Sequence, residues 1–368
     1  MDIKQYEADQ RTEDSFDDTG IKELNEKQHE LRPVRLKPLH EQVIVITGAS
    51  SGIGLVTARM AAEQGAKVVV AARNEQALQQ LVRELHGKGH EAAYVKADVG
   101  SETDVTRIAE TAINQFGSFD TWVNNAGVSI YGHALDTSVP DIERMFKTNF
   151  WGVVFGSREA VKHFKERDES GALINIGSLF GDHGTVVQSA YAASKFAVNG
   201  WTESIRMELD KENAPVSVTL VHPGRIDTPY NEHARSYMDE QPAHRGMIYP
   251  PEAVAEAILF AAANPKRDMY VGSQAKIFQL LGTLFPKLTD RIVKSYMYQT
   301  SHANRPSKPR GDSALYKAGY GLHERGTNVG VIRSGSLYVK AAKHPVLTAV
   351  ALAGAGYLGW RALSKRDR

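Results

Sequence analysis

The chain has 368 residues, a net charge of +1 at pH 7, 42% hydrophobic residues and no cysteine. The near-zero charge gives no global field that favours nucleic acid. The missing cysteines exclude disulfides, thiolate zinc sites and a cysteine nucleophile, and we expect no metal site. Because residues 2–10 are polar and acidic, no secretory signal peptide is expected, and the composition fits a cytoplasmic protein.

The chain opens with a polar, mostly acidic tail over residues 1–40, with room for a short helix in IKELNEKQHELR. Residues 41–275 then alternate short Val- and Ile-rich runs with helical stretches. Six runs are typical of buried strands: VIVITG, KVVVAAR, AAYVKAD, DTWVNNAG, ALINIGS and VSVTLVHPG. This alternation predicts an α/β fold with a doubly wound parallel sheet, as a single domain with tails.

Three segments follow this domain. Residues 276–300 read as an apolar helical extension split by Pro286, and residues 301–344 as an irregular connector rich in Gly, Pro, Ser and basic residues. Residues 345–368 contain an apolar stretch followed by a basic cluster, which is short for a bilayer span of about twenty residues. Attachment to the cytoplasmic face of a membrane is one interpretation of it. A buried helix packed on the main domain or on a second subunit is the other.

A glycine-rich turn between the first predicted strand and helix indicates a dinucleotide site. Gly48, Gly52 and Gly54 allow a tight turn and a close approach of a pyrophosphate to the backbone. A helix beginning near Ile53 would direct free amides and its positive dipole end at the phosphates.

The end of the second predicted strand distinguishes the two nicotinamide cofactors. Proteins that prefer NAD place an acidic residue there, whereas this chain has Ala72 followed by Arg73. An arginine can pair with a 2′-phosphate, and Ser51 can add a hydrogen bond. The sequence therefore favours NADP(H) over NAD(H).

From residue 42 to about 275 the chain resembles the short-chain dehydrogenase/reductase family. The motifs, in chain order, are TGASSGIG at 47–54, ADV at 97–99, NNAG at 124–127, Asn149 in FKTNFWG, Ser178 thirteen residues before Tyr191, YAASK at 191–195, and HPGRIDTP at 222–229. The resemblance implies a Rossmann-type catalytic domain that interconverts an alcohol and a ketone or aldehyde.

The resemblance also assigns roles. Tyr191 would be the general acid/base, with Lys195 one helical turn away lowering its pKa and holding the nicotinamide ribose. Ser178 would bind the substrate oxygen, and Asn149 would hold a water that links Lys195 to solvent. The expected cofactor-binding residues are Gly48, Ser50, Ser51, Gly52, Ile53, Gly54, Arg73, Asp98, Val99, Asn125, Ala126, Gly127, Tyr191, Lys195, Pro223, Gly224 and Thr228.

Two positions depart from the family pattern, and other functions stay open. Gly177 stands where a second serine is common, and Arg225 follows the Pro-Gly pair, where it could influence what binds. The segment between Thr228 and Pro250 corresponds to the family's mobile lid and does not name the substrate. A homo-oligomer is expected by resemblance. The alternatives are a non-catalytic NADP-binding scaffold or redox sensor, and a membrane-tethered interaction protein.

Overall fold

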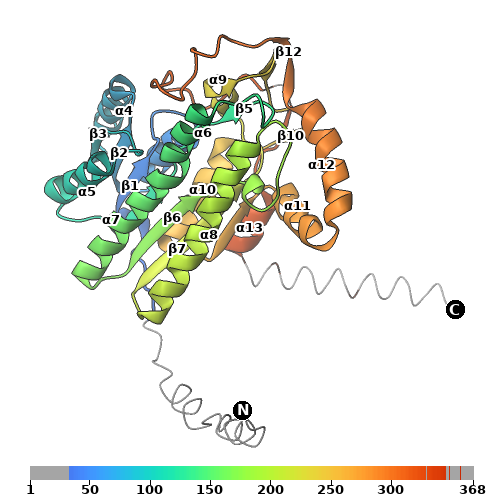
Figure 1. The fold of residues 1–368 in the computed structure, drawn as a ribbon. Coiled ribbons are helices and arrows are strands. Elements are labelled where there is room, and N and C mark those ends of the chain that lie inside the picture. Colours follow the sequence, from blue (N-terminus) through green and yellow to red (C-terminus); the bar gives the residue numbers. More distant parts are fainter. Residues whose placement is uncertain (1–32, 329, 345–347, 349–356, 358–368) are drawn as a thin grey trace, which may run out of the picture.

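A seven-stranded parallel sheet forms the centre of the computed structural model, which describes residues 33–328, 330–344, 348 and 357 (Figure 1). The strand order is β11-β7-β6-β4-β1-β2-β3. The strands are β1 (Val43–Thr47), β2 (Lys67–Ala72), β3 (Ala92–Lys96), β4 (Thr121–Asn124), β6 (Gly171–Ile176), β7 (Val216–Pro223) and β11 (Asp268–Val271). The predicted doubly wound α/β fold is confirmed.

The sequence pattern of the central strands follows from their burial on both faces. Every residue of β1, β4, β6 and β7 is buried, and such strands lack a solvent face that would call for alternating polar residues. Val45 of β1 lies in register with Val69 of β2 on one side and Trp122 of β4 on the other. The short β11 was missed because its four residues begin with an aspartate and carry no long apolar run.

Helices cover both faces of the sheet. One layer contains α3 (Gly52–Glu63), α4 (Glu75–Gly87) and α10 (Pro251–Ala263), and the other contains α5 (Glu102–Phe116), α7 (Gly152–Arg167) and α8 (Ser189–Lys211) (Figure 1). The apolar side chains of α4 form one stripe, which is buried against the first face. A short α6 (Val139–Phe146) continues through the π-helix η2 (Lys147–Trp151) into α7.

The segment expected to act as a mobile lid is joined to its surroundings by three short strand pairs. It contains α9 (Tyr230–His233), β8 (Arg235–Ser236), β9 (Glu240–Pro242) and β10 (Met247–Ile248). β8 pairs with β5 (Ile130–Tyr131), β9 with β12 (His302–Pro306), and β10 with β13 (Val331–Ile332). Two of the three partners come from the C-terminal part of the chain, which therefore holds the lid against the domain.

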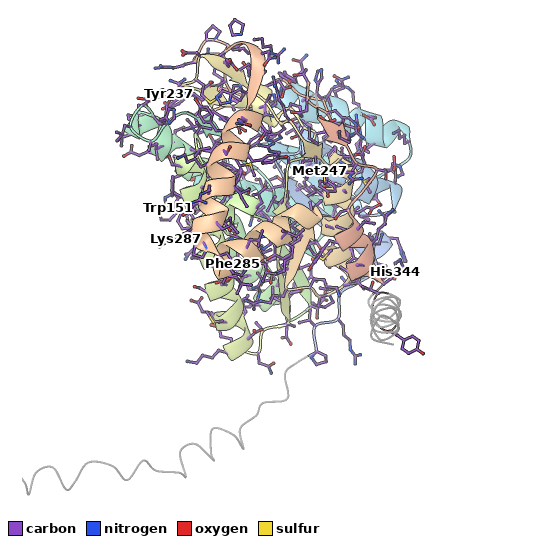
Figure 2. The ribbon with its side chains drawn as sticks, turned by 90° about the vertical axis from the view of Figure 1, so that its right-hand side faces the viewer. Trp151, Tyr237, Met247, Phe285, Lys287 and His344 are labelled. Carbon is purple, nitrogen blue, oxygen red and sulfur yellow. The ribbon has the colours of Figure 1, made fainter. Side chains whose placement is uncertain are left out.

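The C-terminal part begins with α11 (Ser273–Leu284) and α12 (Pro286–Thr300), whose junction carries the labelled Phe285 and Lys287 in Figure 2. Residues 301–344 are not wholly irregular, since they contain β12, β13 and α13 (Leu337–Lys343). The start of α13 is capped, because the Ser336 hydroxyl accepts from the amide of Val339, whose side chain is buried. Between β12 and β13 the chain crosses the top of the domain toward α4 (Figure 1).

The predictions for the acidic tail and the C-terminal apolar stretch concern residues that lie almost wholly outside the described ranges. Among the residues the structure does describe, none of the helices combines the length and apolarity that crossing a bilayer requires.

Candidate active site

Two adjoining cavities lie at the carboxyl ends of the central strands, where doubly wound folds bind their ligands. They share five lining residues: Ile53, Asn125, Gly127, Thr228 and Tyr230. The shared wall makes them two halves of one groove. We call them the Arg73 half and the Tyr191 half, after a residue that each contains.

The groove brings together nearly all residues singled out from the sequence. The Arg73 half contains Gly48, Ser50, Ser51, Gly52, Ile53, Arg73, Asp98, Val99, Asn125, Ala126, Gly127 and Thr228. The Tyr191 half contains Ser178, Tyr191, Lys195, Pro223 and Gly224. Gly54 and Asn149 line neither cavity. They lie behind the wall of the groove.

Close backbone contacts explain two of the loop glycines. Gly48 has a φ of +69°, and a Cβ there would lie 2.7 Å from the Cα of Ala126. A Cβ on Gly54 would lie 2.4 Å from the carbonyl oxygen of Gly48. The Asn125 side chain fixes the same turn by donating to the carbonyl oxygen of Thr47 at 2.9 Å. Glycine is therefore required at both positions for this turn to pack.

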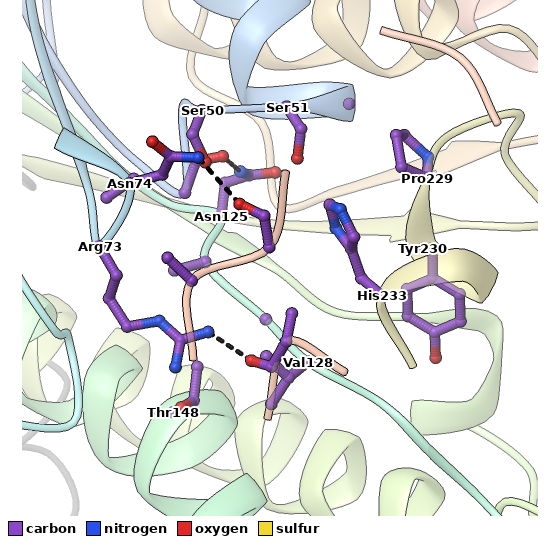
Figure 3. Close-up of a pocket in the computed structure, with 18 of the residues that line it drawn as sticks. Ser50, Ser51, Arg73, Asn74, Asn125, Val128, Thr148, Pro229, Tyr230 and His233 are labelled. Atoms are coloured by element: carbon purple, nitrogen blue, oxygen red, sulfur yellow. Dashed lines mark hydrogen bonds between the residues drawn. The ribbon is translucent and has the colours of Figure 1, made fainter. Parts of the chain in front are cut away.

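Arg73 lies at the far end of the groove, as Figure 3 shows. Burial lowers the pKa of its guanidinium, and Asp98 opposes that shift. Asp98 is itself paired with Arg144 at 2.5 Å. The Arg73 guanidinium donates to the carbonyl oxygens of Ala314 and Leu315. A segment far along the chain therefore orients Arg73. Nothing in the sequence indicated this contact.

Lys195 and Tyr191 lie on the first turns of α8, where both side chains are buried. The Lys195 ammonium donates to the carbonyl oxygen of Ile176 at 2.8 Å, and its Nζ lies 5.9 Å from the centre of the Tyr191 ring. Burial lowers the pKa of Lys195 to about 8, because the low-dielectric surroundings penalise its charged form.

Tyr191 shares its hydroxyl environment with Ser178 and Tyr230. Burial raises the pKa of Tyr191, while hydrogen bonds to the hydroxyls of Tyr230 and Ser178 oppose the rise. The expected lowering of this pKa by Lys195 is therefore not found, since desolvation of the phenol outweighs the other effects. The Tyr230 ring meets the Tyr191 ring edge-on, with the centroids 5.7 Å apart.

The Asn149 side chain is hydrogen-bonded to other residues of the protein. Its amide donates to the carbonyl oxygen of Val128 at 3.0 Å and to the Ser194 hydroxyl at 3.1 Å. Its Oδ1 accepts from the Val128 amide at 2.8 Å. It lies in the π-helix η2, a local widening that often marks functional sites. These bonds join η2, the wall of the groove and α8.

The sequence analysis missed three polar or aromatic residues of the Tyr191 half: Gln188, Tyr230 and His244. Gln188 donates to the Tyr230 hydroxyl at 3.1 Å. Burial, assisted by the charge of Arg225, lowers the pKa of His244 to about 3, so this imidazole is neutral at pH 7. Its Nδ1 has no hydrogen-bond partner among the described residues. No spacing rule could have identified these positions, because the lid brings two of them to the cavity through tertiary contacts.

Arg225 lines the Tyr191 half, but its guanidinium is bonded within the protein. Its guanidinium donates to the carbonyl oxygen of Arg245 and to the Met297 sulfur, the latter at 3.2 Å, and it lies 5.6 Å from the Tyr296 ring. Burial lowers its pKa. Because these partners hold its polar end, Arg225 connects the groove wall to α12.

The fold and the groove define a doubly wound α/β protein with a groove at the carboxyl ends of its strands. A family model described as short chain dehydrogenase matches residues 42–239. The chain belongs to the short-chain dehydrogenase/reductase family of oxidoreductases, whose members use NAD(P).

Relatives agree with this assignment. The Bacillus subtilis protein called uncharacterized oxidoreductase YxnA is 66% identical over 352 residues, which cover 95% of this chain and 98% of that one. A short-chain dehydrogenase/reductase from Burkholderia phymatum, solved in complex with NAD, superimposes with a TM-score of 0.58 at 26% identity. That match covers 73% of this chain and 97% of that chain. A short-chain type dehydrogenase/reductase from Mycobacterium marinum gives a TM-score of 0.56 at 27% identity, covering 63% and 94%.

Proposed function

We propose that this protein is an NADP(H)-dependent oxidoreductase that interconverts an alcohol and a ketone or aldehyde, with Tyr191 as general acid/base. One observation carries the proposal: Tyr191, Lys195 and Ser178 line one end of the groove whose other end contains the glycine loop and Arg73. A dinucleotide along this groove would extend from the arginine to the phenol.

In this proposal, each polar residue of the Tyr191 half would have its own role in the reaction. The dinucleotide, when bound, supplies or accepts the hydride. Tyr191 would donate its proton to the carbonyl oxygen during reduction and remove it during oxidation. Ser178 would donate a hydrogen bond to the same oxygen, so that growing negative charge there meets an oriented dipole. Lys195, whose ammonium donates to the carbonyl oxygen of Ile176, would hold the nicotinamide ribose. It would also form part of the path along which Tyr191 recovers its proton.

The preference for NADP over NAD is supported by the donors in the Arg73 half. Ser50, Ser51 and Arg73 supply two hydroxyls and a guanidinium, and Asp98, the acidic residue of this cavity, is neutralised by Arg144. This donor set suits a phosphate group. The NAD in the Burkholderia phymatum relative makes NAD the competing cofactor to test.

A neutral, mainly apolar carbonyl compound is the substrate class that the cavity favours. Apolar residues, among them Ile176, Leu179 and Phe180, form much of the wall. Its two cations, Lys195 and Arg225, donate to backbone carbonyl oxygens. The neutral His244 offers a polar partner for a second group on the substrate.

A homo-oligomer belongs to the same proposal. Trp151, the last residue of η2 directly before α7, and Phe196 and Met207 of α8 are exposed. Exposed apolar side chains on neighbouring helices mark contact surfaces. We place the subunit contact on α7 and α8.

Attachment to a membrane surface is the interpretation that we propose for the C-terminal part. Leu280, Leu284 and Phe285 are more than half exposed at the junction of α11 and α12, with the exposed Lys287 beside them (Figure 2). Apolar and basic groups together suit an anionic lipid surface. Co-sedimentation with anionic but not with neutral vesicles checks this, and equal recovery in the supernatant with both would contradict it.

A substrate screen tests the function. Purified protein is given a panel of alcohols, steroids, retinoids and acyl ketones, the carbonyl compounds with NADPH or NADH and the alcohols with NADP or NAD, and the absorbance of the reduced nicotinamide is followed. We expect turnover of apolar members with NADPH. Tight NADPH binding without turnover of any member would instead support a scaffold or redox sensor.

A further inference from the structure

A C-terminal segment outside the family match lies over the Arg73 half of the groove. We call residues 314–325 the strap. It follows β12, crosses the carboxyl ends of the strands and passes beside the glycine loop before the chain reaches β13 (Figure 1). The family model ends at residue 239, so the general family pattern does not include the strap.

Backbone hydrogen bonds join the strap to the glycine loop. The Leu322 amide donates to the carbonyl oxygen of Ser50 at 2.7 Å, and the Gly52 amide donates to the carbonyl oxygen of His323 at 2.9 Å. An ion pair between Arg59 of α3 and Glu324 at 2.5 Å continues the contact. The strap therefore runs along the glycine loop and is bonded to it at more than one position.

A second set of bonds joins the strap to the end of β2. Arg73 donates to the carbonyl oxygens of Ala314 and Leu315, and Asn74 donates to the carbonyl oxygen of Gly319 at 2.9 Å. In Figure 3 a dashed line marks a hydrogen bond from the guanidinium of Arg73. Leu315 is fully buried, which fixes the strap at this end.

The strap forms a wall of the cavity without filling it. Its three residues that line the Arg73 half are Ala314, Ala318 and Gly319, the smallest side chains that a wall could have. The guanidinium of Arg73 has five N–H donors, and two carbonyl oxygens leave the others for a further acceptor. The arrangement thus leaves room and hydrogen-bonding capacity beneath the strap.

We propose that the strap is part of the dinucleotide site: it encloses the adenosine end, holds Arg73 in position for a 2′-phosphate, and must detach for the dinucleotide to enter or leave. This inference rests on the proposed function, because it assumes that the groove binds NADP(H). The strap would retain the cofactor between turnovers, so its contacts would control the release rate.

Two glycines offer a matched pair of variants. In Gly321→Ala the new Cβ would lie 2.3 Å from the Cβ of Ala77 on α4 and 3.2 Å from the carbonyl oxygen of Ser50, so the strap must move away from the loop. In Gly311→Ala, upstream of the strap, the new Cβ meets nothing within 4 Å. Asn74→Ser is a second, gentler variant, since serine keeps a helix-capping acceptor for α4 but lacks the side-chain amide that donates to the carbonyl oxygen of Gly319.

The experiment measures NADPH release from the full-length protein by stopped-flow fluorescence, with excess NADP as the chase. Circular dichroism verifies folding of each variant. We expect Gly321→Ala to release NADPH at least about tenfold faster and Asn74→Ser about threefold faster, because interface changes act mainly on dissociation rates. Gly311→Ala should release NADPH at the wild-type rate.

Each other outcome overturns the inference in a recognisable way. Equal release rates in folded wild type and all variants would make the strap a surface segment without influence on the cofactor. NADPH binding by Gly321→Ala but not by wild type would show that the strap blocks the groove. If neither the wild type nor Gly321→Ala bound NADPH or NADH, the proposed function would be wrong. The enclosing role of the strap, which depends on that function, would then be wrong too.

Discussion

The ammonium of Lys195 is bonded to the carbonyl oxygen of Ile176, at the end of β6, at 2.8 Å. This bond anchors the α8 lysine to the central sheet and keeps its charge in a buried position, 5.9 Å from the centre of the Tyr191 ring. Burial shifts the pKa values of the two side chains in opposite directions. Burial lowers the pKa of Lys195 to about 8 and raises that of Tyr191.

Tyr191→Phe tests the acid/base assignment directly. The variant keeps the ring and its contact with Tyr230 but removes the transferable proton. We expect turnover to fall by about 10²-fold to 10⁴-fold, the usual contribution of a general acid, with NADPH affinity nearly unchanged. Steady-state kinetics and a fluorescence titration check both quantities. Retention of more than about a tenth of the wild-type turnover would count against Tyr191.

The pH dependence of reduction follows from the two shifted groups. Tyr191 must be protonated to donate, and its raised pKa keeps it protonated through neutral pH. Lys195 loses its charge as the pH rises through about 8. We therefore expect the reduction rate to be level near neutrality and to decline above about pH 8. A profile of kcat against pH checks this, and a rate that still increases from pH 8 to pH 9 would contradict it.

Lys195→Met is expected to stabilise the fold while abolishing turnover. The pKa of Lys195 is lowered in the folded state, so below pH 8 the folded protein must keep a buried ammonium. The free energy of unfolding of the wild type should rise between about pH 8 and the ordinary lysine pKa of 10.5, where the unfolded chain binds more protons.

Methionine removes that dependence. The gain at pH 7 has an upper limit of about 3 kcal/mol, since one pKa unit corresponds to about 1.4 kcal/mol, and the lost bond to Ile176 reduces it. Urea unfolding at pH 7 and pH 10 measures the effect. The control is Lys294→Met on the exposed surface of α12, which should change stability little. A Lys195→Met variant less stable than wild type at pH 7 would show that the Ile176 bond outweighs the burial cost.

Arg73→Ala separates the two cofactors. We expect the KM for NADPH to rise about tenfold to a hundredfold, because a phosphate–guanidinium pair is lost. The KM for NADH should change less, through the weakened strap alone. The ratio of kcat/KM for the two cofactors is the readout. A ratio equal to that of the wild type would remove Arg73 from the choice of cofactor.

Trp151→Asp combined with Phe196→Asp tests the subunit contact on α7 and α8. Both side chains are exposed, so the folded monomer should tolerate the charges while an apolar interface should not. Light scattering coupled to size-exclusion chromatography should report a smaller particle than for the wild type. Leu135→Asp, at a fully exposed loop position, is the control and should leave the size unchanged.

Local features of the chain were enough to predict the fold and much of the groove. Buried strands require continuous apolar runs, so six of the seven strands could be predicted. A βα turn that binds a dinucleotide requires glycines at fixed positions, which predicted Gly48. Residues four apart on a helix share a face, which predicted Tyr191 and Lys195 as a pair. These signals lie within a few residues of one another.

The remaining features were decided by the tertiary structure. Arg73 bonds to carbonyl oxygens 241 and 242 residues further along the chain. Every residue carries such an oxygen, so the sequence holds no pattern that marks these partners. The same reason applies to Lys195 and Ile176. The pKa of Tyr191 likewise depends on how deeply the assembled lid and strands bury the phenol, and burial of that kind exists only once the whole domain has folded.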